Sequence, residues 1–204
     1  MAVYSLEGSQ DSCYPDTTVL VNKLDIRTQK LLTEAESVLV TSCSVKLEKT
    51  MRFENVDFDY YKNLHRQMFS DLYDWAGTVR KINISKKGTV FCNASDIERI
   101  GTLKFERLKK QKFLKEMKND EFLDELTDLY HELNMLHPFR EGNGRTLRLF
   151  VTLLVRNTGR DIDFNNADSD LLTIATIRAA QGDKSLLRSC LLYTSPSPRD
   201  GLLS

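Results

Sequence analysis

The residues most able to do chemistry lie together in one short segment. Residues 137–148 read His-Pro-Phe-Arg-Glu-Gly-Asn-Gly-Arg-Thr-Leu-Arg. A histidine can accept a proton from a reacting group near neutral pH. Two glycines follow where a loop is predicted to become a helix, and the unpaired N–H groups and dipole of a helix start bind anions. The segment therefore joins a candidate base to a candidate phosphate site.

Charged side chains in the same segment extend this interpretation. Arg145 and Arg148 are three residues apart, so both lie near one side of the first helical turn, and paired guanidinium groups suit a polyphosphate. Glu141 adds a carboxylate of the kind that holds Mg²⁺ beside nucleotide phosphates. The following helix is apolar nearly all round and is predicted to be buried. Arg148 must therefore meet either an internal carboxylate or a polar cavity that a ligand fills.

The segment resembles the motif of the Fic family, His-Pro-Phe-x-(Asp/Glu)-Gly-Asn-Gly-Arg-x-x-Arg, with Glu141 at the acidic position. The resemblance covers about residues 14–188 and implies a mainly α fold, a helical bundle with a small β-hairpin called the flap. Further stretches that resemble bacterial members of the cell-filamentation type are Tyr14-Pro15, Asn22–Ile26, Leu64–Phe69, Tyr73–Gly77 and Asn83–Lys86.

The resemblance also implies an activity, the transfer of AMP from ATP to a Ser, Thr or Tyr hydroxyl of a target protein. His137 would be the general base, and Glu141 would hold Mg²⁺ between the phosphates. An anion hole and two clamping arginines would bind the nucleotide. These nucleotide-binding residues would be Gly142, Asn143, Gly144, Arg145 and Arg148.

A hairpin is predicted upstream of the motif. Apolar residues flank a polar turn that contains a glycine, which is typical of two short antiparallel strands within residues 78–92. The family resemblance makes this hairpin the flap, which would hold an extended target segment by strand-like pairing. The residues expected to contact the target are Ile84, Ser85, Lys86, Lys87 and Gly88.

Helical periodicity accounts for most of the remaining chain. We expect helices at about 16–49 in two pieces, 58–75 with Asp57 as N-cap, 95–117, 120–136, 144–157, 169–180 and 184–192. Residues 1–13 are predicted to be an N-terminal extension and 14–193 a single Fic domain with its core at about 57–160. Residues 194–204, with two Ser-Pro pairs, are predicted to be a disordered tail, for which a foreign, cloning-derived origin is the alternative.

Composition limits the classes of partner. Lys plus Arg and Asp plus Glu each number 29, and zero net charge argues against a protein whose main task is direct binding of nucleic acid. The sequence has neither an apolar run long enough to span a membrane nor a visible secretory signal. The four cysteines are widely separated, as is typical of reduced thiols in a cytoplasmic protein. The basic run at 95–117 is expected to be a solvated helix face, and His65 and His131 to be structural.

Two questions stay open at this level. Many Fic proteins are restrained by a helix that carries Ser/Thr-x-x-x-Glu-Gly/Asn, whose glutamate pairs with the second motif arginine. Thr50–Asn55 matches this pattern in cis through Glu54, but it precedes Asp57, where a loop is expected; we favour a separate antitoxin-type protein. The alternatives to adenylylation are another nucleotide or phosphate-linked group, or a regulatory nucleotide-binding module, against which the presence of a base argues.

Overall fold

Seven α-helices and a three-stranded sheet make up the part of the chain that this computed structural model describes, residues 4–6, 12–86, 88–164 and 167–194. The elements are β1 (Tyr4–Leu6), α1 (Gln29–Thr50), α2 (Phe58–Phe69), β2 (Ile84–Lys86), β3 (Thr89–Val90), α3 (Ile97–Lys110), α4 (Asn119–Leu136), α5 (Asn143–Asn157), α6 (Ser169–Ala180) and α7 (Ser185–Thr194). Short 3₁₀ turns cover Ala94–Asp96 and Lys112–Leu114. The predicted mainly α class is confirmed.

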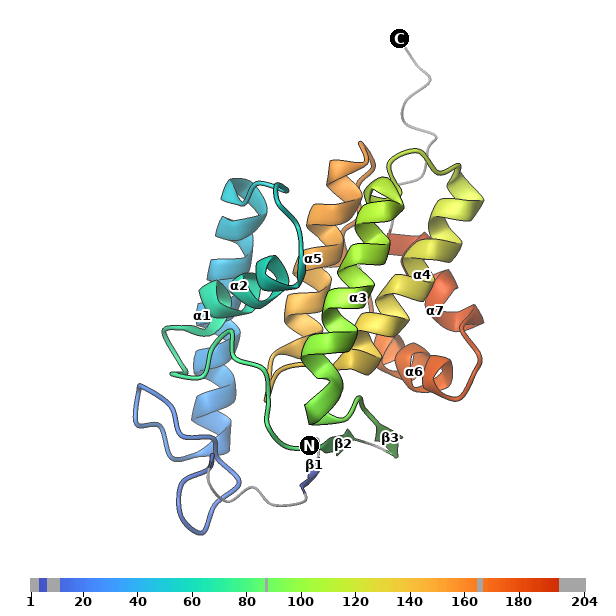
Figure 1. The fold of residues 1–204 in the computed structure, drawn as a ribbon. Coiled ribbons are helices and arrows are strands. Elements are labelled where there is room, and N and C mark those ends of the chain that lie inside the picture. Colours follow the sequence, from blue (N-terminus) through green and yellow to red (C-terminus); the bar gives the residue numbers. More distant parts are fainter. Residues whose placement is uncertain (1–3, 7–11, 87, 165–166, 195–204) are drawn as a thin grey trace.

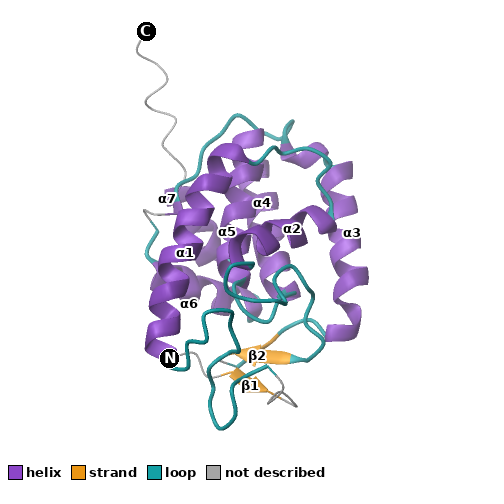
Figure 2. Ribbon diagram, turned by 90° about the vertical axis from the view of Figure 1, so that its left-hand side faces the viewer, coloured by secondary structure: helices purple, strands orange, loops and turns teal. Residues whose placement is uncertain are grey.

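Helix α5 forms the centre of the bundle. It contacts α1, α2 and α4, and the sheet lies at the end of the bundle where α5 begins (Figures 1 and 2). Every residue from Leu149 to Val155 is buried, as the apolar sequence predicts. Burial of this many large side chains is the main source of stability in such a helix. The first turn of α5 is thereby held in a fixed position relative to the neighbouring helices.

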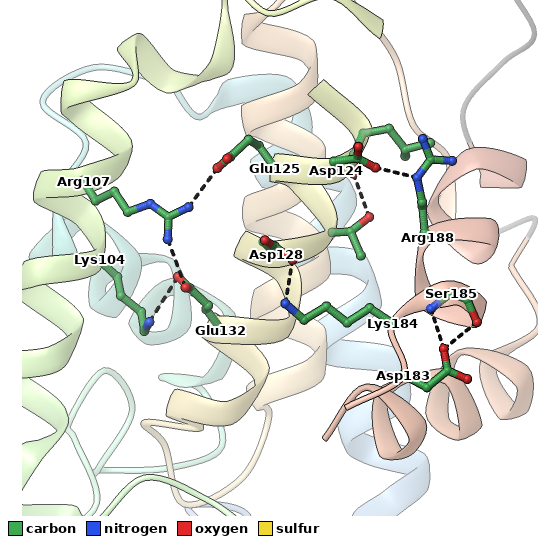
Figure 3. Close-up of polar contacts among 12 residues, drawn as sticks. Lys104, Arg107, Asp124, Glu125, Asp128, Glu132, Asp183, Lys184, Ser185 and Arg188 are labelled. Carbon is green, nitrogen blue, oxygen red and sulfur yellow. Dashed lines mark hydrogen bonds and ion pairs between the residues drawn. The ribbon is translucent and has the colours of Figure 1, made fainter. Parts of the chain in front are cut away.

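Helix α4, which ends one residue before His137, is fixed on both flanks by ion pairs. Arg107 of α3 contacts Glu125 at 2.9 Å and Glu132 at 3.0 Å, and Lys184 contacts Asp128 at 2.7 Å (Figure 3). These side chains are partly exposed, so each pair contributes little stability alone. The basic face of α3 is thus a solvated surface in which several cations pair with α4.

The first predicted helix is wrong over residues 16–28, which form turns instead. Asn22 organises this segment, because its Oδ1 accepts from the N–H of Ile26 at 3.0 Å and its Nδ2 donates to the Ile26 carbonyl at 2.7 Å. The N–H of Lys23 donates to the Leu72 carbonyl at 2.8 Å. A side chain that satisfies nearby backbone groups competes with helix formation. Here the backbone bond between Lys23 and Leu72 stabilises the turns further.

Helix α2 begins where the sequence predicts and ends earlier. The carboxylate of Asp57 accepts from the N–H of Tyr60 at 2.8 Å, which confirms the N-cap. The helix ends at Phe69 rather than near residue 75, and turns follow. They close at Gly77, whose φ is +77° and where a Cβ would lie 2.7 Å from the Cβ of Arg66. The chain folds back on α2 too closely for a side chain at that position.

The predicted hairpin is present, with a third strand that the sequence did not indicate. Ser85 pairs with Val90 in the β2–β3 ladder, and Gly88 has a φ of +79° in the turn. Lys87 lies outside the described residues. β1, within the predicted N-terminal extension, pairs antiparallel with β2 in the register that sets Tyr4 opposite Lys86. β2 is therefore the central strand.

The C-terminal helices follow the predictions closely. α6 has the predicted bounds, but the predicted tail begins one residue too early, because Thr194 closes α7. Its carbonyl accepts from the N–H of Asp163 at 2.8 Å, and its hydroxyl bonds within the helix. The rest of the predicted tail lies outside the described residues. Within the described part of the chain, no helix has the length and apolar character needed to cross a membrane, and the cysteines are free thiols.

Candidate functional site

His137 is held as a neutral imidazole at the end of α4. It is the C-cap, with a left-handed φ of 42°, and Pro138 follows. Its Nδ1 lies 3.2 Å from the carbonyl of Asn134, which can only accept, so Nδ1 carries the proton and Nε2 has the lone pair. Burial lowers the pKa of His137 to about 4, and the charge of Lys86 acts in the same direction. Burial thus outweighs the preference of a helix end for a protonated histidine.

The ring of Phe91 covers one face of this imidazole. The two ring centroids are 3.8 Å apart and the planes nearly parallel. Phe91 follows β3, so the flap and the candidate base are in direct contact. The imidazole also lines a cavity of about 150 Å³ together with Lys86, Thr89 and Gly144. The imidazole of His137 therefore lines a cavity that both the flap and the first turn of α5 border.

Arg80 is a structural residue of the site that the sequence analysis did not identify. It is 4% exposed, and its guanidinium donates to three carbonyls: His137 at 2.8 Å, Ile82 at 2.6 Å and Cys92 at 2.5 Å. The backbone N–H of Arg80 donates to the Pro138 carbonyl at 2.8 Å. One buried cation thus joins both ends of the flap to the loop between α4 and α5. An arginine beside an alternating apolar stretch is the only signal the sequence offered.

The loop between α4 and α5 is closed by the side chain of Asn143. Its Oδ1 accepts from the N–H of Phe139 and its Nδ2 donates to the Phe139 carbonyl, both at 2.8 Å. Phe139 is fully buried and anchors this loop in the core. The Asn143 side chain is thus committed to the loop through its Oδ1 and one Nδ2 hydrogen. Its backbone N–H lies at the start of α5, where the sequence predicts the anion hole.

Gly142 is required by both conformation and space. It is the N-cap of α5 with a φ of +79°, and a Cβ there would lie 2.3 Å from the Cζ atom of Phe69. Next to it, the backbone N–H groups of residues 143–145 have no protein acceptor within the described part of the chain. These three donors lie at the positive end of the α5 dipole, where the sequence predicts an anion site.

Arg148 lines two cavities and forms no ion pair among the described residues. It lines the 150 Å³ cavity beside His137 and a larger groove of about 460 Å³ between α1, α5 and α6. The buried hydroxyl of Tyr130 lies beside it, and no ion pair to Arg148 occurs among the described residues. Of the two alternatives that the sequence left open for this cation, the structure favours the polar cavity.

Helix α6 forms a wall of the site that the sequence analysis did not assign. Ser169, Thr173 and Thr176 line the cavity with His137, together with apolar residues of the same face. Their spacing of four and three residues places them on one side of the helix. That spacing of hydroxyl side chains is visible in the sequence, but only the fold shows that this face meets α4 and α5.

His65 packs against the loop between α4 and α5 and is hydrogen-bonded to it. The N–H of Gly77 donates to its Nδ1 at 2.8 Å, so its Nε2 carries the proton and donates to the Glu141 carbonyl at 3.0 Å. The ring lies between Phe139, with centroids 3.8 Å apart, and Phe69, at 4.6 Å. Burial lowers the pKa of His65 to about 4, so it stays neutral. The expected structural role fits these contacts.

Glu141 is the candidate metal ligand. Its Oε1 accepts from the N–H of Gly142 at 2.9 Å, and Arg145 Nη2 lies 3.7 Å away. Nowhere in the described ranges do three or more His, Cys, Asp or Glu side chains gather as a metal cage. Mg²⁺ is often held by one or two carboxylates completed by substrate phosphates. A single carboxylate beside an anion site fits that mode.

Neither Glu54 nor Glu48 of α1 forms an ion pair with Arg148. Glu54 is exposed in the loop between α1 and α2, as expected for this segment. Glu48, on α1, pairs with Arg156 at 3.0 Å. Thr50 is the last residue of α1, so the Thr50–Asn55 match is not a helix.

Comparison with known proteins gives a consistent result. A profile of the Fic/DOC family matches residues 55–155. The chain is 36% identical over 172 residues to the probable protein adenylyltransferase y4lH of Sinorhizobium fredii, covering 84% of this chain and 88% of that protein. It is 34% identical to the protein adenylyltransferase VbhT of Bartonella schoenbuchensis, covering 91% of this chain but only 39% of VbhT.

The fold comparison agrees. The crystal structure of the Bartonella tribocorum protein BepC, with bound AMPPNP, superposes with a TM-score of 0.85 at 26% identity, over 92% of this chain and 97% of that one. The chain belongs to the Fic/DOC family.

Proposed function

We propose that this chain is a protein adenylyltransferase that moves AMP from ATP to a hydroxyl of a target protein. The observation that carries this proposal is the neutral His137, whose Nδ1 is engaged by Asn134 and whose ring lines one cavity with Gly144 and Arg148. The base, the anion site and a polyphosphate clamp thus share one space. The names of the relatives support the same activity. A module that only bound nucleotide would not need a base.

The chemistry follows from this arrangement. His137 Nε2 accepts the proton of the target hydroxyl as the oxygen attacks the α-phosphorus. The bond from that phosphorus to the bridging oxygen breaks, and pyrophosphate leaves. Negative charge that develops on the phosphates meets the N–H donors of residues 143–145 and the guanidinium groups of Arg145 and Arg148. These groups are fixed before the reaction by the buried α5, so little reorganisation is required.

Glu141 is the residue that would hold Mg²⁺, which neutralises phosphate charge when bound. The carboxylate lies at the α5 start, and its backbone is fixed by His65. Buffer without Mg²⁺ should therefore abolish transfer. Glu141→Gln, which keeps the shape and removes the charge, should raise the Mg²⁺ requirement.

The flap is the proposed target-binding element. Lys86, Thr89 and Phe91 border the same cavity as His137, so a segment held on the flap lies close to the base. β1 already pairs with one edge of β2, which leaves β3 as the outer strand for an added target strand. Val90 on β3 is 70% exposed. Val90→Asp should weaken target modification while nucleotide affinity is unchanged, and unchanged modification would contradict this assignment.

We also propose restraint in trans by a small antitoxin-type protein in the cytosol. The groove between α1, α5 and α6 is lined by apolar Val40, Val45 and Leu149 and by Arg148. A partner helix that carries a glutamate would fit this combination. The proposal predicts that Glu54→Gly leaves autoadenylylation of the isolated chain at the wild-type rate. A strong rise would instead place the restraint in the chain itself.

The activity is tested with ATP labelled at either the α- or the γ-phosphate. Incubation of the chain with Mg²⁺, candidate targets and α-labelled ATP should label protein, and γ-labelled ATP should not. Label from the γ-phosphate alone would indicate phosphorylation and refute the proposal. Absence of both labels with measurable ATP binding would favour a regulatory module. Parallel reactions with the other nucleoside triphosphates establish whether ATP is preferred.

A further inference from the structure

A carboxylate of α1 meets the first motif arginine. Glu36 Oε2 accepts from Arg145 Nη2 at 2.8 Å, although the two residues are 109 apart in the chain. The hydroxyl of Tyr73 donates to the other carboxylate oxygen in a short hydrogen bond. The Glu36 side chain is only 12% exposed. A charged group so far from solvent needs such partners, and here both come from other elements.

Arg145 therefore lies between two carboxylates at unequal distances. Its Nη2 is hydrogen-bonded to Glu36 and 3.7 Å from Glu141, which is too long for a hydrogen bond. The guanidinium also lies over the ring of Phe69, 4.9 Å from the centroid. The contacts with Glu36 of α1 and Phe69 of α2 hold the guanidinium in this position. Nε and Nη1 have no protein acceptor within the described ranges, so they remain for phosphate oxygens.

Tyr73 keeps this arrangement asymmetric. It is 1% exposed, and burial together with the charge of Glu36 holds the pKa of its hydroxyl well above the ordinary value. The hydroxyl is therefore a neutral donor at any working pH. It fixes one oxygen of Glu36 and leaves the other for Arg145. The Glu36–Arg145 pair cannot move toward Glu141 without loss of the hydrogen bond between Tyr73 and Glu36.

We propose that Glu36 is a positioning residue, which holds Arg145 near Glu141 but not on it, so that the arginine serves the phosphates and the Glu141 carboxylate serves Mg²⁺. This inference rests on the proposed adenylyltransferase function. Without the negative charge of Glu36, Arg145 closes onto Glu141 and competes with the cation for that carboxylate. The consequence is a specific one, a weaker response to Mg²⁺ rather than a general loss of nucleotide binding.

The test compares Glu36→Gln with Glu34→Gln, the same change on an exposed side chain of the same helix. Calorimetry measures binding of a non-hydrolysable ATP analogue in EDTA and across a Mg²⁺ titration. For Glu36→Gln we expect the half-saturating Mg²⁺ concentration to rise roughly tenfold, the lower end of the losses seen when groups outside the metal ligands are removed, because Glu36 acts on Glu141 through Arg145. Affinity in EDTA should stay within about twofold of wild type. Glu34→Gln should match wild type in both.

The outcomes separate the alternatives. Equal losses with and without Mg²⁺ would show that Glu36 is only a structural tie between α1 and α5, and would overturn the inference. So would a Glu36→Gln protein that matches Glu34→Gln. If Glu36→Gln does not fold, Tyr73→Phe carries the same test with a smaller expected shift in the same direction. A wild type that binds no nucleotide overturns the proposed function as well.

Discussion

The two buried histidines predict a marked loss of stability in mild acid. Burial lowers the pKa values of His65 and His137 to about 4. In the unfolded chain each titrates near its ordinary value of about 6.5. Between these values the unfolded state binds more protons, so stability falls as pH decreases from about 6.5 toward 4. Above pH 7 both states are neutral and this term vanishes.

The magnitude follows from linkage. At pH 5 a histidine with these two pKa values lowers the free energy of unfolding by about 2 kcal/mol relative to pH 7. Together His65 and His137 give about 4 kcal/mol, a large part of the roughly 5–15 kcal/mol that holds a domain folded. His65→Gln removes one of the two contributions. The difference in stability between pH 7 and pH 5 should therefore shrink by about 2 kcal/mol, whatever the variant loses at pH 7.

The assay is urea unfolding at pH 7 and pH 5, followed by the fluorescence of the single tryptophan. His131→Gln serves as a comparison, and because its ring is less buried the change should be smaller. An unchanged pH dependence in His65→Gln would refute the reasoning. It would mean that His65 titrates alike in the folded and unfolded states and is not the neutral support of the catalytic loop.

Three further predictions concern the loop and the base. Arg80→Ala leaves three carbonyls, one buried and two partly buried, without their donor. It should lower the free energy of unfolding by roughly 2–4 kcal/mol in urea titrations, and a loss below that range would contradict its role in joining the flap to the loop. Gly142→Ala should lower the free energy of unfolding by at least about 2 kcal/mol, because the new Cβ clashes with Phe69. Gly159→Ala, at a position with the same φ and open space around it, should lower it by about 1 kcal/mol. Equal losses in the two variants would contradict the clash. Because His137 is neutral far below pH 6, kcat/KM should not show the roughly fivefold fall between pH 6.5 and 5.5 that an ordinary histidine base gives.

Local signals in the sequence located most of the helices. α6 has the predicted bounds, and α4 ends at Leu136 because proline at position 138 restricts His137. The apolar run of α5 correctly predicted a buried helix. The motif itself identified the segment that now borders the cavity. Each of these features is determined within about one or two helical turns of the chain.

What the sequence did not predict depends on contacts between distant residues. The turns at 16–28 resemble a helix in their apolar spacing, and only the backbone bond from Lys23 to Leu72 shows where they lie. β1 is three residues long and pairs with a strand about 80 residues away, so no pattern marks it. Arg80 and Glu36 are ordinary charged residues until the fold brings their partners to them. The sequence shows that these side chains are charged, but not that they become buried beside the site.

The most direct measurement of the central claim separates nucleotide binding from transfer in His137→Ala. Calorimetry with a non-hydrolysable ATP analogue should give an affinity close to that of wild type, since the anion site and arginines are intact. The rate of AMP transfer to a target, followed by intact mass, should fall by about 10²–10⁴. Transfer at the wild-type rate would show that His137 is not the base and would contradict the account.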